Sequence, residues 1–273
     1  MIRTPQERER TRATIASMSR KLMLSNRVVE LCESEATPRQ EEFLLKVLSE
    51  EIDRRERGRK ARLLNRAGFP TFKSFEDYDF SEIRFPPALS REELLRTDFI
   101  PEKKNLVLYG GVGTGKTHMA IALGIAACEK SLSVRFLTVT ELVLKLTEAY
   151  KQGTLERLIR DLKQLDLLIL DEWGYVPVDR EGSQLLFRII ADSYESKSLI
   201  LTTNLEFSKW GGIFTDEQMA AAMIDRLVHH GHLLLFEAKS YRMTHALMRQ
   251  PGPGKLKPKT TVETGPRLEE GGA

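Results

Sequence analysis

The sequence predicts an α/β fold, a doubly wound parallel five-stranded sheet preceded by a small all-helical N-terminal domain. Three observations support this prediction. From residue 105 onward, short apolar runs alternate with helical patterns, which is typical of a parallel sheet. A glycine-rich phosphate-loop motif directly follows the first of these runs. Residues 1–67 show helical periodicity instead, and that pattern stops at Gly68-Phe-Pro70.

The N-terminal domain, residues 1–67, is expected to contain two amphipathic helices. Thr4-Pro5 is typical of a helix start, and the first helix is expected to run from there to about Glu33. The second helix is expected to begin after Thr37, because Gln40 stands at capping-box spacing and apolar residues then recur at helical intervals. We expect this domain to serve oligomerisation, partner docking or DNA binding.

The continuation of the second helix is strongly basic and is a candidate DNA contact. Basic side chains can neutralise duplex phosphates without reading bases. Acidic residues lie in the same stretch, so a solvated helix face is an equal alternative. The candidates here are Arg55, Arg59 and Arg62.

Residues 68–104 form an aromatic-rich connector, which we expect to pack onto the main domain at 105–249. Residues 250–273 are rich in Pro, Gly, Lys and Thr and predict a disordered tail. The expected strands of the main domain are Asn105 to Tyr109, Val134 to Thr138, Asp166 to Asp171, Leu199 to Thr203 and Leu233 to Phe236.

The most specific motif is GGVGTGKT, which matches the phosphate-loop pattern G-x-x-x-x-G-K-[ST] in full. It predicts binding of ATP with Mg²⁺. Glycines let the backbone approach the phosphates, Lys116 supplies positive charge, and the Thr117 hydroxyl can ligate Mg²⁺. The residues expected to bind the nucleotide are Gly110, Gly111, Val112, Gly113, Thr114, Gly115, Lys116, Thr117, His118 and Asp171.

Two further strands end in polar residues that predict catalytic roles. The run Leu167 to Glu172 is an apolar strand that ends in paired carboxylates, the Walker B pattern. Asp171 is expected to hold Mg²⁺, and Glu172 to polarise the water that attacks the γ-phosphate. The next strand is followed by Asn204, whose amide could hydrogen-bond that water or the γ-phosphate.

Two arginines near the end of the main domain are candidate phosphate ligands. Arg226 follows a helical pattern and Arg242 follows a strand pattern. Guanidinium groups can donate to phosphate oxygens in bidentate fashion. An ordinary surface salt bridge is an equal alternative for each.

A helical insertion is expected at about Glu141 to Leu165, between the second and third strands. Its basic residues could contact DNA phosphates, although intervening acids also fit an ordinary solvated helix. The candidates are Lys145, Lys151, Arg157, Arg160 and Lys163.

Together these motifs resemble the AAA+ ATPases of the initiator and helicase-loader group, which are P-loop NTPases. Finer features resemble the IstB family, the ATPase partners of insertion-sequence transposases, over residues 69–245. They are GTGKTH, LDEWGYVP from Leu170 to Pro177, TTN from Thr202 to Asn204, Trp210, and DRLVHH ending at His230.

The resemblance implies a Mg²⁺-dependent and slow ATPase whose turnover is coupled to assembly. Its implied catalytic residues are Glu172, Lys116, Asn204, Arg226 as an arginine finger in a neighbouring subunit, and Arg242 as a sensor arginine. Few residues follow Arg242, so whether it acts within its own subunit or across the interface stays open. The implied partners are duplex DNA, which the protein deforms, a cognate transposase, and further copies in a ring or helical array.

Two alternatives remain at this stage: a helicase loader similar to DnaC, and a structural DNA scaffold that binds ATP without meaningful catalysis. The formal charge of +3, from 42 basic and 39 acidic residues, does not by itself indicate a nucleic-acid partner. We find no signal peptide and no apolar stretch of about 18 residues, which disfavours secretion and membrane spanning. The expected location is the bacterial cytoplasm, in association with the nucleoid.

Overall fold

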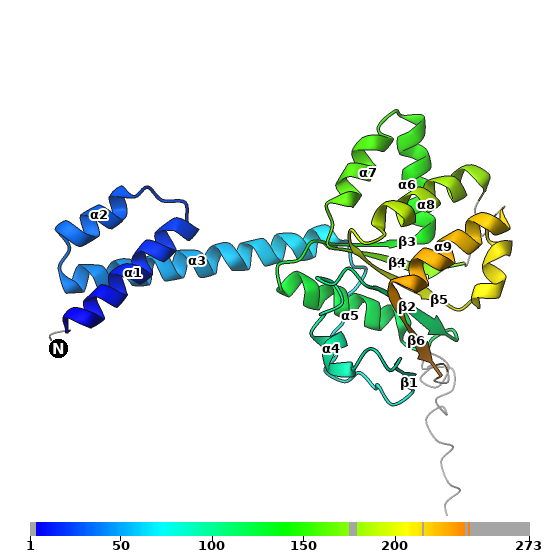
Figure 1. The fold of residues 1–273 in the computed structure, drawn as a ribbon, viewed down its shortest axis with the longest axis horizontal. Helices are drawn as coiled ribbons and strands as arrows, with labels where there is room; N and C mark the ends of the chain where they lie inside the picture. The colour runs from blue at the N-terminus through cyan, green and yellow to red at the C-terminus, as the bar shows by residue number, and fades with distance from the viewer. Residues whose placement is uncertain (1–3, 175–178, 215, 238–239, 241–273) are drawn as a thin grey trace, which may run out of the picture.

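The chain folds into an α/β core with a helical module extending from one side (Figure 1). The computed structural model describes residues 4–174, 179–214, 216–237 and 240. The predicted fold class is confirmed. One detail was wrong, because the sheet formed by these residues has six strands rather than five.

The sheet has the strand order β1-β6-β2-β5-β4-β3, and every neighbouring pair is parallel except β1 with β6. The extra strand, β1, belongs to the connector and covers the edge of β6. Its two residues are too short to give a sequence pattern. The strands are β1 (Ile83–Arg84), β2 (Asn105–Gly110), β3 (Val134–Thr138), β4 (Leu167–Trp173), β5 (Ser198–Thr203) and β6 (Gly231–Phe236).

Helices cover both faces of the sheet, and alternate residues of β4 point into the two cores. Leu168 and Leu170 pack with α6, α7, α8 and α9, whereas Leu167 and Ile169 pack with α5 and the connector. The core helices are α4 (Arg91–Leu95), α5 (Lys116–Glu129), α6 (Val139–Lys151), α7 (Leu155–Lys163), α8 (Arg180–Ser193), the 3₁₀ helix η1 (Phe207–Gly212) and α9 (Glu217–His229).

The insertion between β3 and β4 is helical, as predicted, and consists of the two helices α6 and α7. Gly153 lies between them with a φ of 70°, a left-handed conformation that ends α6. None of the helices in the described part of the chain has the length and apolar character that a membrane crossing requires.

The N-terminal module, residues 4–67, contains three helices: α1 (Pro5–Lys21), α2 (Arg27–Ser34) and α3 (Pro38–Ala67). The expectation of one helix to about Glu33 was wrong. The chain turns at Met23, whose φ is 61°, so that Cys32 reaches the same small core as Ile15 and Leu48. No glycine or proline marks this turn, and packing of the module core decides it.

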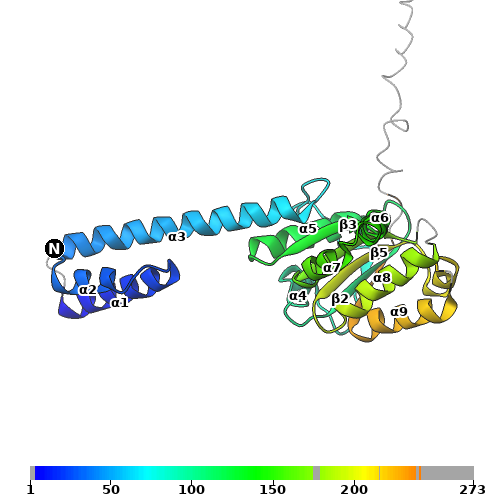
Figure 2. The same ribbon diagram turned by 90° about the horizontal axis from the view of Figure 1, so that it is seen from above.

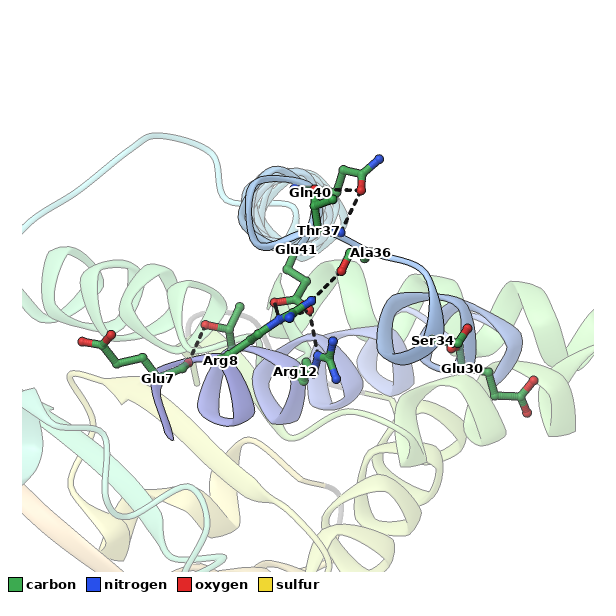
Figure 3. A network of polar contacts seen from close by, with 10 residues as sticks. Glu7, Arg8, Arg12, Glu30, Ser34, Ala36, Thr37, Gln40 and Glu41 are labelled. Carbon is green, nitrogen blue, oxygen red and sulfur yellow. Dashed lines mark hydrogen bonds and ion pairs between the residues drawn. The ribbon is translucent and has the colours of Figure 1, made fainter. Parts of the chain in front are cut away.

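A buried carboxylate joins α1 to the start of α3 (Figure 3). Glu41 is 1% exposed, and its oxygens accept hydrogen bonds from Arg8 Nε at 2.9 Å and Arg12 Nε at 2.7 Å. Arg8 also donates through Nη2 to the carbonyl of Ala36 at 2.6 Å. Burial acts to raise the pKa of Glu41, but the hydrogen bonds and charges of Arg12 and Arg8 outweigh it, so the net pKa is lowered.

We expect Glu41→Gln to destabilise the folded N-terminal module by about 2 kcal/mol, because two charge-assisted hydrogen bonds are weakened in a buried site. The lowered pKa of Glu41 sets the sign of the pH dependence. Its contribution is complete above its ordinary value of 4.5 and disappears as the pH falls through the lowered folded-state pKa. Urea unfolding monitored by circular dichroism at several pH values measures both effects.

Glu9→Gln is the matched control, because it removes the same charge from an exposed position on α1. Equal unfolding midpoints for the two variants would show that the buried network adds nothing to stability.

Helix α3 connects the module to the core (Figure 2). Its first half packs on α1, and its last turns contact β3 and α5. Arg135 Nη1 donates to the carbonyl of Arg66 at 2.6 Å, and Arg59 Nη2 donates to that of Ser131 at 3.3 Å. Gly68, with a φ of 76°, ends the helix and sends the chain into the connector.

Candidate nucleotide-binding site

The phosphate-loop motif lies where β2 passes into α5, at the carboxyl edge of the parallel sheet. Strand β2 is flanked by β6 and β5, so the loop stands near the middle of the sheet. Ligands of open α/β sheets bind at this edge. Helix α5 begins at Lys116, and its N-terminal amides and dipole favour an anion there.

The ammonium group of Lys116 is held against the phosphate loop by hydrogen bonds to loop carbonyls. The side chain is 8% exposed, and its Nζ donates to the carbonyls of Gly110 at 2.8 Å and Gly111 at 2.6 Å. These carbonyl acceptors have no formal charge. The ammonium group therefore adds positive charge to the site at the N-terminus of α5, which suits a phosphate group.

Two residues of the connector hold the first turn of α5. Tyr78 donates its hydroxyl to the carbonyl of Gly115 at 3.1 Å, and a Cβ on Gly115 would lie 2.9 Å from that hydroxyl oxygen. His118 donates through Nε2 to the carbonyl of Ser74 at 2.7 Å. Burial raises the pKa of Tyr78, which keeps its hydroxyl protonated as a donor.

The connector was predicted to pack on the core, and its aromatic residues do so. A role of these aromatic residues at the nucleotide site was not predicted. The many aromatic residues that precede the phosphate loop indicate such packing, but only the fold determines which of them contacts α5. The packing of Tyr78 against Gly115 also gives a local reason for glycine at this position, where φ is 97°.

The phosphate-loop and Walker B motifs meet through a direct contact. The Thr117 hydroxyl lies 2.9 Å from Asp171 Oδ1 and 3.1 Å from Oδ2, and Asp171 is 5% exposed. A buried carboxylate beside a threonine hydroxyl at the phosphate loop has the oxygen donors that Mg²⁺ prefers. These residues therefore fit a magnesium ion.

The other two strand-end residues predicted to be catalytic lie at the same edge. Glu172 follows Asp171 on β4 and is exposed, whereas Asp171 is buried. Asn204 comes directly after β5, which stands between β2 and β4, and it is half-buried. The topology thus brings Lys116, Asp171, Glu172 and Asn204 to one edge of the sheet.

Arg226 lies elsewhere. It belongs to α9, whose end leads into the amino end of β6, where the carbonyl of His230 accepts a hydrogen bond from Asn105 N at 2.8 Å. The phosphate loop follows the opposite end of β2, and six residues of strand span about 20 Å. Arg226 donates to the carbonyl of Ala222 at 2.9 Å, and its guanidinium carbon lies 5.2 Å from the ring centre of Phe187.

Arg242 lies outside the described residues, as do residues 175–178, which include the end of the LDEWGYVP motif. The tail predicted at 250–273 is outside them as well. Its predicted disorder and the predicted role of Arg242 therefore stay predictions.

The basic residues of the insertion are exposed on α6 and α7. Lys163 is paired with Asp192 at 3.1 Å. The remaining four make no ion pair with any other residue that the structure describes. These four are Lys145, Lys151, Arg157 and Arg160. A surface whose cations are mostly not engaged in ion pairs suits phosphate binding better than an internally paired helix face does.

The candidates on α3 have more structural roles. Arg55 donates hydrogen bonds to the Glu51 carboxylate at 2.8 Å and to the carbonyl of Leu22 at 3.3 Å. Arg59 donates to the carbonyl of Ser131 in the core. Arg62 is exposed. Two of the three thus help to hold the module together or to the core, which weakens the case for α3 as a dedicated DNA surface.

Comparisons with known proteins agree with this site. A family model described as IstB-like ATP binding protein matches residues 20–248. The ATP-binding protein of insertion sequence IS21 from Pseudomonas aeruginosa is 39% identical over 206 residues, which cover 74% of this chain and 76% of that protein. The corresponding protein of IS232 from Bacillus thuringiensis is 35% identical over 205 residues, covering 74% and 81%.

Among solved structures, the DnaC helicase loader is 20% identical, with a TM-score of 0.48 over 64% of this chain and 98% of that chain. AMPPCP-bound DnaA from Aquifex aeolicus is 21% identical, with a TM-score of 0.48 over 63% of this chain and 52% of that chain. These two similarities are too distant to carry a functional argument.

Proposed function

This chain belongs to the IstB-like ATP-binding protein family, and from that premise we propose that it is an ATP-dependent helper of DNA transposition. In this proposal, ATP drives it to oligomerise on duplex target DNA, which it deforms, and the assembly recruits or stimulates a cognate transposase. The relatives named as insertion-sequence ATP-binding proteins support this reading over helicase loading. The observation that carries it is the contact of Thr117 with Asp171 beside Lys116.

The site residues can bind and hydrolyse ATP. Lys116 and the amides at the start of α5 would hold the phosphates, and Thr117 and Asp171 would hold Mg²⁺. The metal supplies charge that stabilises the phosphate oxygens. Glu172 is exposed beside the buried Asp171, so its carboxylate is available to accept a proton from an attacking water, and Asn204 would orient that water.

The position of Arg226 supports a site completed by assembly. It stands near the amino edge of the sheet, whereas the phosphate loop stands at the carboxyl edge of the same subunit. A guanidinium held there is better placed for a neighbouring copy than for its own nucleotide. Hydrolysis would therefore be slow in the monomer and coupled to assembly, and Arg226 would stabilise the charge of the transition state in the next subunit.

Contact with DNA is assigned to α6 and α7, whose exposed basic residues lie on one insertion. Contacts to phosphates give DNA binding that depends little on the base sequence and weakens as the salt concentration rises. Many such contacts along a ring or helical array can offset the cost of bending the duplex, about 1–6 kcal/mol for a site of 20–30 base pairs. The transposase is the remaining partner in the proposal.

Mass photometry with linear duplex DNA tests the proposal, comparing ATP, ADP and no nucleotide at fixed moderate salt. We expect large DNA-bound oligomers with ATP alone. Arg226→Ala is expected to lower kcat for assembly-stimulated hydrolysis by about 10³-fold, the contribution of an arginine finger. Basal ATP binding should remain.

Arg20→Ala is the matched control for Arg226→Ala. Each arginine donates to the carbonyl four residues earlier on its own helix, but Arg20 lies on α1, far from the sheet. A monomer indifferent to nucleotide would overturn the assembly model and favour helicase loading or another role that depends on a partner. Equal losses for both variants would remove the special role of Arg226.

A further inference from the structure

Strand β4 contains a bulge at the two Walker B carboxylates. Leu170 pairs with Leu201 of β5, but the next pair is Trp173 with Thr203. Two residues of β4, Asp171 and Glu172, therefore stand opposite the single residue Thr202. A bulge of this kind interrupts the ladder hydrogen bonds and redirects side chains, and such bulges concentrate next to active sites.

The Thr202 side chain makes hydrogen bonds to β4 at the position where the strand ladder is interrupted. Its hydroxyl donates to Asp171 Oδ1 and accepts the backbone N–H of Glu172 at 3.0 Å. Thr202 is 2% exposed, so no bulk water competes for either bond. One hydroxyl group thus fixes the carboxylate of one acidic residue and the backbone of the next.

The backbone of Glu172 needs such support. Its φ is 63°, a left-handed conformation that is unfavourable for a residue other than glycine. The conformation separates the neighbouring carboxylates, because Asp171 becomes buried next to Thr117 while Glu172 becomes exposed. Without the bond to its N–H, Glu172 would have an unpaired donor as well as an unfavourable φ.

We propose that Thr202 is a positioning residue for hydrolysis, which holds Glu172 in the left-handed conformation that aims its carboxylate at the nucleotide edge. In this proposal Thr202 acts on the reaction through Glu172, whose backbone it holds, and not by contact with the nucleotide. The inference rests on the proposed ATPase function. It assigns a specific role to the buried hydroxyl of Thr202, to which the TTN motif by itself gives none.

The test compares Thr202→Val, which keeps the shape and removes the hydroxyl, with Thr202→Ser, which keeps the hydroxyl. Misplacement of a catalytic group by about 1 Å can cost 10²-fold in rate, so Thr202→Val is expected to lower kcat by about that factor. KM for ATP should change by less than about threefold, because Lys116 and the phosphate loop keep their contacts and Asp171 keeps its hydrogen bonds to Thr117. Thr202→Ser should restore kcat to within about threefold of the unchanged protein.

A double-mutant cycle separates positioning from general damage. If Thr202 acts through Glu172, adding Thr202→Val to Glu172→Gln should lower single-turnover hydrolysis by less than about threefold further. Thr203→Val is the matched control, since it removes the neighbouring buried hydroxyl, which donates to the carbonyl of Trp173 at 2.9 Å. It should lower kcat far less than Thr202→Val at a similar cost in thermal stability.

The outcomes distinguish this inference from the proposed function. Absence of ATPase activity in the wild-type protein, or normal ATP hydrolysis by the Glu172→Gln variant, would overturn the proposed function. An active protein that needs Glu172 but keeps its kcat in Thr202→Val would overturn the role of Thr202 alone. Should Thr202→Val not fold, Thr202→Ala replaces it, and equal kcat for the Ala and Ser variants would be the overturning result.

Discussion

Glu172→Gln is expected to preserve ATP binding and ATP-dependent assembly on DNA while hydrolysis falls by about 10²–10⁴-fold, the usual contribution of a general base. Glutamine keeps the size of the side chain and the backbone N–H that bonds Thr202. It removes the carboxylate that would accept a proton. Steady-state phosphate release, measured beside mass photometry of the same sample, tests both halves of the expectation.

The control for this variant is Glu195→Gln. Glu195 is another exposed glutamate with a left-handed φ, 52° against 63° for Glu172, but it follows α8 rather than β4. The same substitution in the same backbone conformation should leave hydrolysis unchanged there. Normal turnover in Glu172→Gln would show that the assigned general base is wrong.

Lys116→Ala is expected to abolish ATP-dependent assembly. Removal of a buried charged partner of phosphate costs about 2–5 kcal/mol, so ATP affinity should fall by about 30-fold to several thousand-fold. The substitution also removes the bonds to the carbonyls of Gly110 and Gly111. Titration with a fluorescent ATP analogue gives the affinity, and mass photometry with DNA gives the assembly.

Lys104→Ala is the control for the loss of a lysine. Lys104 precedes the other end of β2 and pairs with Glu102 at 2.7 Å, so it lies a whole strand length away from the phosphate loop. Assembly of Lys116→Ala at the ATP concentration that the unchanged protein needs would show that ATP acts through another site.

Local sequence patterns predicted the parts of the fold that local chemistry determines. The helix start at Thr4-Pro5 and the capping box of Thr37 with Gln40 are confirmed, because a capping side chain and the residue it meets lie only three positions apart. The phosphate loop follows a buried strand as expected. Predicted strand and helix bounds are close to the observed ones wherever a turn residue marks them.

Features fixed by contacts between distant segments could not be predicted in this way. The turn at Met23 depends on the packing of the module core, and β1 depends on pairing with β6, which lies about 150 residues further along the chain. The bulge opposite Thr202 is a mismatch between two strands, and neither strand alone shows it. The contact of Tyr78 with Gly115 likewise joins segments that only the fold brings together.

The single helix α3 gives the molecule a mechanical property. Thirty residues at 1.5 Å each make a rod about 45 Å long that is anchored at one end on β3 and α5. A tilt of about 10° at this anchor would move the far end by about 8 Å, by simple lever geometry. Such a displacement is larger than a base-pair step. A small rearrangement in the core would therefore move the N-terminal module by a larger distance, and a force on the module would act on the core through the same lever.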